Sequence, residues 1–369
     1  MSVLIDLIEG GLLPDAVIRR GIRRLLKLRL RDEYHGDTEV ERQRQREFFA
    51  LLRKSPLAVA TDAANDQHYE LPPAFFSQVL GPRRKYSSCL YPIGVTSIAA
   101  AEEAMLTETC RRAGLADGMD ILELGCGWGS LTLWMAEQYP NARITAVSNS
   151  APQRGYIQEL CREKGFANVR VVTADMNVFA IDETFDRVVS VEMFEHMRNY
   201  AELLRRISGW LKPDGRLFVH IFCHRELAYF FETEGEDNWM GRYFFTGGIM
   251  PSDHLLFYFN DHLLVEDHWR VNGRHYQQTC EDWLTRQDAR REQIIPILQD
   301  AYGDEAELWF QRWRVFFMAC AELFGYNNGN EWFVGHYLLR KPQQGIQIPT
   351  INTDELFCDD LSGGPPEMT

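Results

Sequence analysis

From residue 120 onward, short runs of apolar residues alternate with amphipathic stretches along the chain. The runs are rich in Val, Ile and Leu and stop at turn-forming residues such as Lys-Pro-Asp-Gly at 212–215, as strands do. Strands that alternate with helices in this way predict a parallel sheet covered by helices. The expected strands are 120–125, 142–149, 169–175, 185–193, 215–222, 263–271 and 332–340.

Several regions lie outside this alternation. Residues 225–260 are dense in aromatic side chains and predict a cap inserted into the main domain, and two helices are expected across 279–325. Because the first 60 residues have a helical pattern, we expect a helical N-terminal extension or lid over 1–80 and a main domain over 81–341. The tail, 342–369, contains a Gly-Gly-Pro-Pro run and is expected to be disordered.

The most informative segment follows the first expected strand, where three glycines occupy alternating positions: Gly125, Gly127 and Gly129. A helix-compatible stretch comes next, so a tight turn with bare backbone joins strand to helix, at the sheet edge where ligands bind. A dinucleotide turn needs G-x-G-x-x-G, but Ser130 occupies the third glycine position. The G-x-G-x-G spacing, with Glu123 before it, instead resembles motif I of class I S-adenosylmethionine (AdoMet)-dependent methyltransferases. A plain glycine-rich turn is the alternative.

Composition mainly excludes other classes of protein. The 369 residues are 45% hydrophobic and 12% aromatic, as in an ordinary globular protein. No apolar run approaches the roughly 20 residues of a membrane span, and the N-terminus lacks the layout of a signal peptide. The eight cysteines are scattered, which predicts reduced thiols in the cytoplasm and no metal site. The net charge of −14 argues against a nucleic-acid partner.

One basic segment differs from this acidic background. Residues 18–31 contain seven Lys and Arg residues interleaved with apolar ones. Such a stretch is typical of a helix that makes peripheral contact with anionic lipid. The alternative is a surface helix packed on the main domain with its charges in water. The sequence favours this second interpretation because acidic partners are abundant.

Candidate ligand-binding residues follow the second and third expected strands. Asn149 and Gln153 come after the second strand, where most class I methyltransferases have an acidic residue for the ribose hydroxyls. Asn149 can make one such hydrogen bond without adding charge, so the chain departs from that pattern. Asp175 ends the third strand, where a carboxylate can accept from an adenine amino group. An N-cap on a following helix is the alternative role for Asp175.

Three ionisable residues follow the fourth expected strand: Glu192, Glu195 and His196. Their i, i+3, i+4 spacing would place all three on one face of a helical turn. Two carboxylates and an imidazole can bind a cationic substrate and remove its proton, and crowding raises the pKa of one carboxyl group. Methyl transfer to nitrogen needs this step because only an unprotonated amine has a free lone pair. An ordinary helix start rich in Glu is the alternative.

Three segments together resemble the cyclopropane-fatty-acid synthase superfamily of methyltransferases: Tyr-Glu-Leu-Pro-Pro-Ala-Phe-Phe at 69–76, Tyr-Ser-Ser-Cys-Leu-Tyr at 86–91 and Met-Phe-Glu-His at 193–196. Within it, further segments are similar to the coclaurine N-methyltransferase branch of plant benzylisoquinoline alkaloid enzymes. These segments are 121–132, 190–197, 199–200, 218–224, 242–248, 272–276 and 324–332. The resemblance extends from about residue 65 to residue 341, and the combination of motifs is highly specific.

The resemblance implies a class I, Rossmann-like α/β fold with a seven-stranded, mostly parallel sheet flanked by helices. It implies AdoMet as the cofactor, bound by Ser88, Gly125, Gly127, Asn149, Gln153, Asp175 and Met176. Glu195 and His196 would be the acid–base pair, and Glu192 would hold ligands where the cofactor and substrate pockets meet. Aromatic rings there would attract an ammonium group. The substrate wall would be formed by the aromatic cap with Tyr91, Phe324 and Trp332.

The predicted function is methyl transfer from AdoMet to the nitrogen of a small cyclic or aralkyl amine, such as a tetrahydroisoquinoline, by a cytoplasmic enzyme that could form a homodimer. The first alternative is methylene transfer to an unsaturated lipid, because cyclopropane synthases resemble this chain at Cys89, Glu195 and His220, which hold a bicarbonate base in that family. Against it, Phe222 replaces the Ile of their His-x-Ile motif, and a carbocation mechanism has no evident use for Glu192. The second alternative is a non-catalytic AdoMet-binding regulator, which would lack a complete base constellation.

Overall fold

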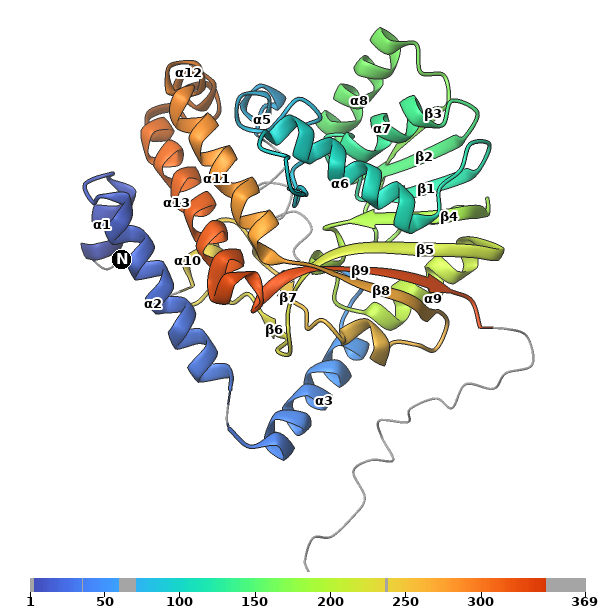
Figure 1. Ribbon diagram of the computed structural model, residues 1–369, viewed down its shortest axis with the longest axis horizontal. Coiled ribbons are helices and arrows are strands. Elements are labelled where there is room, and N and C mark those ends of the chain that lie inside the picture. Colours follow the sequence, from blue (N-terminus) through green and yellow to red (C-terminus); the bar gives the residue numbers. More distant parts are fainter. Residues whose placement is uncertain (1–2, 35, 60–70, 236–237, 343–369) are drawn as a thin grey trace, which may run out of the picture.

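A computed structural model describes residues 3–34, 36–59, 71–235 and 238–342 of the protein (Figure 1). In these ranges seven strands form one sheet with the order β3-β2-β1-β4-β5-β9-β8. The strands are β1 (Asp120–Leu124), β2 (Arg143–Ser148), β3 (Val169–Thr173), β4 (Phe185–Val191), β5 (Leu211–His224), β8 (Leu264–Val271) and β9 (Trp332–Arg340). Strands β1 to β5 pair in parallel, whereas β9 is antiparallel to both β5 and β8. The predicted class I α/β fold is confirmed.

Neighbouring residues of the central strands pack against different helix layers. Leu122 and Leu124 of β1 share an apolar cluster with α9 (Tyr200–Trp210), while Ile121 shares another with α6 (Ile98–Ala113) and α7 (Ser130–Gln138). This division follows from the pleat, which points successive side chains to opposite faces. Helix α8 (Ala151–Lys164) packs on β2 and β3. Because both faces are covered, the central strands contain consecutive buried apolar residues, such as 217–219 of β5.

A third apolar cluster lies beside the sheet and joins helices from distant parts of the chain. Its helices include part of α6 together with α2 (Asp15–Glu33), α5 (Pro73–Val79), α10 (Trp239–Tyr243), α11 (Gly273–Ala289), α12 (Arg291–Tyr302) and α13 (Ala306–Gly325). The prediction of two helices across 279–325 is therefore wrong, because three helices share this stretch. The last break is at Gly303, whose φ of 57° and ψ of −127° are strongly disfavoured for other residues.

The region expected to form a cap contains little regular structure. It holds a small antiparallel sheet of β6 (Tyr229–Phe230) and β7 (Ile249–Met250), together with α10. Short 3₁₀ turns complete the described elements: η1 (Phe194–His196), η2 (Leu255–Tyr258), η3 (Gly303–Glu305) and η4 (Tyr326–Gly329). The expected disordered tail falls outside the described residues from 343 onward.

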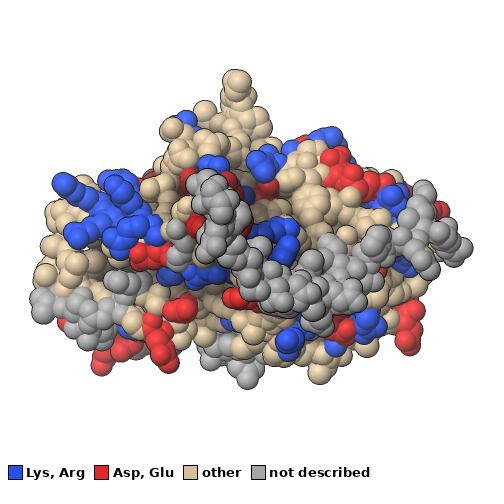
Figure 2. Space-filling model, turned by 90° about the horizontal axis from the view of Figure 1, so that it is seen from below, with Lys and Arg blue, Asp and Glu red and all other residues tan. Residues whose placement is uncertain are grey.

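The N-terminal extension forms α1 (Val3–Glu9), α2 and α3 (Thr38–Lys54). Helix α2 packs on α13, where Arg23 donates to Glu322 at 2.8 Å, and its Arg19 donates to Glu281 of α11 at 2.6 Å. Four other basic residues of this helix are exposed: Arg20, Arg24, Lys27 and Arg31. Figure 2 shows Lys and Arg side chains gathered on the side of the molecule where Figure 1 places α2. In the described ranges no helix is both long and apolar enough to cross a bilayer.

Candidate active site

The glycine turn lines a cavity at the carboxyl ends of β1, β2 and β4. Gly125, Gly127 and Gly129 all have positive φ, at 80°, 51° and 78°. A Cβ atom on Gly125 would lie 2.7 Å from the Cβ of Met193, so a side chain there would collide with the segment that follows β4. A Cβ atom on Gly127 would meet no described atom within 4 Å, so this part of the backbone faces open space. The turn therefore presents bare main chain to a ligand.

Six of the seven residues predicted to bind the cofactor line this one cavity: Gly125, Gly127, Asn149, Gln153, Asp175 and Met176. Gln153 also has an unsatisfied group: its Nε2 is buried and meets no hydrogen-bond partner among the described residues. Its Oε1 accepts from the hydroxyl of Ser148 at 2.6 Å, which fixes the direction of the amide. A buried donor without an acceptor is costly, so Nε2 is suited to a ligand that accepts from it. These features fit AdoMet.

Ser88 is the seventh residue, and the structure does not place it on the cavity wall. Its neighbours Tyr86 and Ser87 line the cavity instead. Ser88 is fully buried, and its backbone N–H donates to Oε1 of Glu192 at 2.9 Å. The expected cofactor contact is thus corrected to a support for Glu192.

Two acidic residues order the loops around the cavity. Glu123 is buried and accepts a hydrogen bond from Thr132 in the first turn of α7, which ties the end of β1 to the helix beyond the glycines. Burial raises the pKa of Glu123 to about 8. Asp175 accepts from the backbone N–H of Asn177 at 2.7 Å, but a turn follows it instead of a helix. The alternative role of Asp175 as a helix N-cap is therefore wrong.

Glu192 is held by donors from three separate parts of the chain. Its Oε1 accepts from the Ser88 backbone and lies 3.1 Å from Nε2 of His220, and its Oε2 accepts from the Tyr276 hydroxyl at 2.6 Å. Burial raises the pKa of Glu192, and the positive charge of nearby Lys85 opposes this rise. The backbone of Glu192 has a φ of 48°, so the residue precedes the 3₁₀ turn η1 and does not belong to it. The predicted single helical face with Glu195 and His196 is therefore wrong.

Glu195 lies deeper than Glu192. Its side chain is fully buried and does not line the cavity. Oε1 accepts from the backbone N–H of Phe222 at 2.8 Å, whereas Oε2 has no hydrogen-bond partner in the described part of the chain. Burial and the nearby charge of Glu192 raise the pKa of Glu195 well above its ordinary value. This carboxyl group therefore keeps its proton more readily than Glu192 does.

His196 lines the cavity next to Glu192, and its ring centroid lies 4.7 Å from that of Phe245. Burial lowers the pKa of His196 to about 4, although the charge of Glu192 works in the opposite direction. The imidazole is therefore neutral at pH 7. A neutral imidazole can accept a proton from a cation bound beside it.

A second cavity adjoins the first and has a mostly aromatic wall. Its lining includes Phe222, Phe231, Phe245, Phe316 and Phe324, with Tyr276 and Trp283. The rings of Tyr276 and Phe324 stack with centroids 4.2 Å apart. Three residues line both cavities: Tyr86, Glu192 and His196. Glu192 and His196 therefore lie where the glycine-rich cavity meets the aromatic one.

Of the three residues predicted for the substrate wall, Phe324 lines this cavity, whereas Tyr91 and Trp332 do not. The hydroxyl of Tyr91 donates to Asp282 at 2.8 Å. The indole of Trp332 is fully buried and donates to the hydroxyl of Tyr229 at 3.1 Å. Both side chains make structural contacts behind the wall, and their predicted placement is corrected accordingly.

Two polar residues of the site have no predicted role from the sequence. Tyr276 donates to Glu192, and Lys85 is a buried cation that donates to the carbonyl of Ser88 at 2.8 Å. Both lie within or directly beside motifs of the resemblance, at 272–276 and 86–91. Their position in or beside these motifs is the only indication of a role that the sequence gives. Neither residue spacing nor composition indicates that Tyr276 and Lys85 lie near the same carboxylate.

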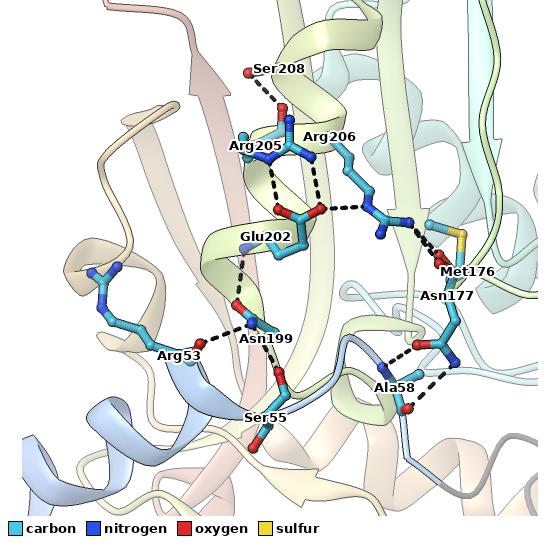
Figure 3. Close-up of polar contacts among 10 residues, drawn as sticks. All are labelled: Arg53, Ser55, Ala58, Met176, Asn177, Asn199, Glu202, Arg205, Arg206 and Ser208. Atoms are coloured by element: carbon cyan, nitrogen blue, oxygen red, sulfur yellow. Dashed lines mark hydrogen bonds and ion pairs between the residues drawn. The ribbon is translucent and has the colours of Figure 1, made fainter.

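The end of α3 and the residues that follow it are fastened to Asn177 and Asn199 (Figure 3). Asn177 uses its side-chain amide to accept from and donate to the backbone of Ala58, at 3.0 and 3.4 Å. Asn199 donates to the carbonyls of Arg53 and Ser55, and Arg206 donates to that of Met176 at 3.1 Å. The strap formed by residues 53–58 therefore braces the wall next to Met176.

The parallel sheet, the glycine turn and the cavity beyond the strand ends together define a class I AdoMet-dependent methyltransferase. The chain belongs to the mycolic acid cyclopropane synthetase family, whose sequence profile matches residues 59–332.

Two relatives are similar to the chain over most of its length. It is 39% identical to (S)-coclaurine N-methyltransferase of Thalictrum flavum subsp. glaucum over 343 residues, 92% of this chain and 95% of the relative. It is 30% identical to cyclopropane-fatty-acyl-phospholipid synthase of Escherichia coli over 76% of this chain and 69% of that one. Among solved structures, coclaurine N-methyltransferase bound to N-methylheliamine and SAH matches with a TM-score of 0.89 and 39% identity, covering 92% and 99% of the two chains.

We expect Gly125→Ala to weaken AdoMet binding by at least about tenfold, equivalent to about 1.4 kcal/mol. The new Cβ would meet the Met193 side chain, and the positive φ disfavours any residue with a Cβ. Isothermal titration calorimetry with AdoMet measures the effect. Gly155→Ala in α8 is the matched control, since a Cβ there meets no described atom within 4 Å, and it should bind AdoMet normally. Normal binding by Gly125→Ala would contradict the proposed role of the turn.

Asn177→Ala should lower the free energy of unfolding by about 1–3 kcal/mol, because two backbone groups of Ala58 lose their partners. It should also weaken AdoMet binding several-fold, since the strap braces the cavity wall. Denaturant unfolding and calorimetry measure the two effects. Asn141→Ala is a control at an exposed site whose side chain bonds only to Asp117. Equal behaviour of the two variants would contradict the bracing role.

Proposed function

We propose that the protein transfers a methyl group from AdoMet to the amine nitrogen of a small molecule. The observation that supports this most directly is the shared wall, because Glu192 and His196 line both the glycine-rich cavity and the aromatic cavity. A cation drawn to Glu192 from the aromatic side would lie at the boundary between the two. AdoMet, when bound, supplies a methyl group on a positively charged sulfur.

Within this proposal, Glu192 is the ionised carboxylate that attracts an ammonium substrate. Three donors surround its oxygens and Lys85 adds a positive charge nearby, whereas Glu195 has one backbone donor. Two adjacent buried carboxyl groups do not both ionise readily. Glu192 accepts more hydrogen bonds, so it carries the negative charge, and Glu195 keeps its proton. An ammonium group beside Glu192 would compensate its buried charge.

His196 is the proposed base. Burial lowers its pKa to about 4, so the ring is unprotonated at neutral pH, and the negative charge of Glu192 favours the protonated ring when it takes one proton from the ammonium nitrogen. The freed lone pair then forms the nitrogen–carbon bond, while the electrons of the carbon–sulfur bond remain on sulfur. The product nitrogen keeps its second proton and positive charge. A positioned base contributes typically about 10²–10⁴-fold to the rate.

The proposed substrate class is a cyclic or aralkyl amine such as a tetrahydroisoquinoline. The aromatic wall around Phe245 and Phe324 supports this choice, because rings bury an aryl group and attract the attached ammonium. The 39% identity to a coclaurine N-methyltransferase over nearly the whole chain supports it independently.

Lipid methylene transfer, the first alternative, is disfavoured by the surroundings of His220. In this protein Nε2 of His220 lies 3.1 Å from the carboxylate of Glu192, which would repel a bicarbonate anion at the same place. Phe222 adds an apolar side chain to the neighbouring wall. A non-catalytic regulator, the second alternative, would have no need of a neutral imidazole beside a buried carboxylate.

A homodimer and a cytoplasmic location stay predictions. Peripheral contact with anionic lipid also stays a prediction, and the exposed basic residues of α2, such as Arg20 and Arg24, are the side chains that would make it. Because α2 is held to α11 and α13 through its other basic residues, such contact would not require the helix to leave the protein.

A panel assay tests the function directly. Purified protein with isotopically labelled AdoMet should methylate 1,2,3,4-tetrahydroisoquinoline and phenethylamine far faster than ethanolamine, because only the aryl amines fill the aromatic cavity. Vesicles of an unsaturated phosphatidylethanolamine should give no cyclopropane product. Label in the lipid acyl chains but not in any amine would reverse the assignment in favour of the alternative.

We expect His196→Ala to lower kcat at least about tenfold at saturating amine, because the proton is no longer removed efficiently. Glu195→Gln should lower kcat at least about tenfold as well, because an amide cannot exchange a proton as the carboxyl group beside the base can. AdoMet affinity measured by calorimetry should stay nearly unchanged. The matched controls are Glu232→Gln and His262→Ala, which alter exposed side chains away from both cavities. Unchanged turnover in both active-site variants would rule out the acid–base assignment.

A further inference from the structure

A chain of hydrogen bonds leads away from Glu192 through two buried histidines to an arginine. Nε2 of His220 lies 3.1 Å from Oε1 of Glu192, and its other ring nitrogen, Nδ1, lies 2.9 Å from Nε2 of His336. Nδ1 of His336 lies 2.8 Å from a guanidinium nitrogen of Arg112. Every ring nitrogen of both histidines is thus engaged.

The fold aligns these four residues across one face of the sheet. His220 on β5 and His336 on β9 are directly opposite each other in the antiparallel ladder, so their side chains point to the same face. Arg112 comes from the last turns of α6, which covers that face, and Glu192 follows the end of β4. Both imidazoles are fully buried, with 0% of their surface exposed.

Arginine sets the direction of every bond in the chain. A guanidinium has donors only, so Nδ1 of His336 must be the acceptor and its proton must reside on Nε2. That proton is donated to Nδ1 of His220, which leaves the His220 proton on Nε2, facing Glu192. Burial and the charges of Lys85 and Arg112 lower the pKa of His220 well below its ordinary value, so the ring is neutral. Each hydrogen bond of the chain therefore has one defined donor and one defined acceptor.

The surrounding charges agree with this assignment. Arg112 forms an ion pair with Glu108 at 2.6 Å and lies over the ring of Trp269. Burial also lowers the pKa of His336, and the neighbouring His220 and Arg112 act in the same direction. At the other end of the chain, Lys85 and the Tyr276 hydroxyl lie near Glu192. Among these contacts only the carboxylates of Glu108 and Glu192 are fixed acceptors.

We propose that Arg112 and His336 are positioning residues that lock His220 as a donor to Glu192 and close this side of the site to the substrate proton. The proposal rests on the amine methyltransferase function for its kinetic consequence, but the locked tautomers are a property of the free protein. Nε2 of His220 already holds a proton, so a proton on Glu192 has no vacant acceptor there. The proton removed from the amine must leave by His196.

Nitrogen-15 NMR of the histidine-labelled full-length protein tests the lock without any substrate. At pH 7 we expect His220 and His336 to be neutral Nε2–H tautomers, each assigned by the signal lost in His220→Gln or His336→Gln. In Arg112→Met the donor is gone and only Glu192 still favours the wild-type direction, so both rings should populate the Nδ1–H form in part. Arg112→Lys retains a group that only donates and should preserve the wild-type tautomers. Arg111→Met, which removes the neighbouring exposed arginine, is the matched control and should also leave them unchanged.

Kinetics with an amine that the enzyme methylates provide the second measurement. Losing one donor to Glu192 should raise KM for the amine by about tenfold in Arg112→Met, with a smaller change in kcat, because ground-state attraction of the cation is weakened. Arg112→Lys and Arg111→Met should retain the wild-type KM.

Three results would overturn the proposal: an Nδ1–H or doubly protonated His220 in the wild type, tautomers that do not respond to Arg112→Met, or an unchanged KM in that variant. If Arg112→Met does not fold, the wild-type and Arg112→Lys spectra still decide. If no amine is methylated, the proposed function fails while the NMR measurement still decides whether the lock exists.

Discussion

A buried carboxylate is stable as an ion only where donors replace the water it has lost, and Glu192 imposes this constraint on the whole site. Its donors come from the loop before α6, from β5 and from α11, which are far apart in sequence. The sheet, the helical cluster and the loop must therefore all be in place before this charge is tolerated. The site around Glu192 therefore forms only when these three parts of the chain have folded together.

The backbone at Glu192 has a conformation that non-glycine residues rarely adopt, with a φ of 48°. Such a conformation persists only where surrounding contacts over-determine it. Here it directs the side chain of Glu192 toward its three donors, while Glu195, in η1, is buried and accepts from the backbone of Phe222. Two carboxyl groups three positions apart consequently differ in how readily they ionise, since burial raises both pKa values but that of Glu195 further.

The fold and most of the cofactor cavity could be predicted from sequence because their signals are local. Apolar runs define strands, and alternating glycines define the turn, whatever the rest of the chain does. The position of Ser88, Tyr91 and Trp332 relative to the cavities could not be predicted, since membership of a motif does not say which way a side chain points. The contact of His336 with His220 spans 116 positions and depends on the register of an antiparallel strand. No local pattern specifies that register.

The two cavities have only Tyr86, Glu192 and His196 in common. Most of the glycine-rich cavity is built from strand ends, whereas the aromatic one is built mainly from α11, α13 and residues 222–250. Replacements in the aromatic wall can therefore change the shape offered to an acceptor molecule while the donor side stays as it is. The residues that hold the methyl donor are therefore largely separate from those that surround the methyl-accepting molecule. Substitutions in the aromatic wall, by natural or laboratory evolution, could accommodate a new methyl-accepting molecule without altering the glycine-rich cavity.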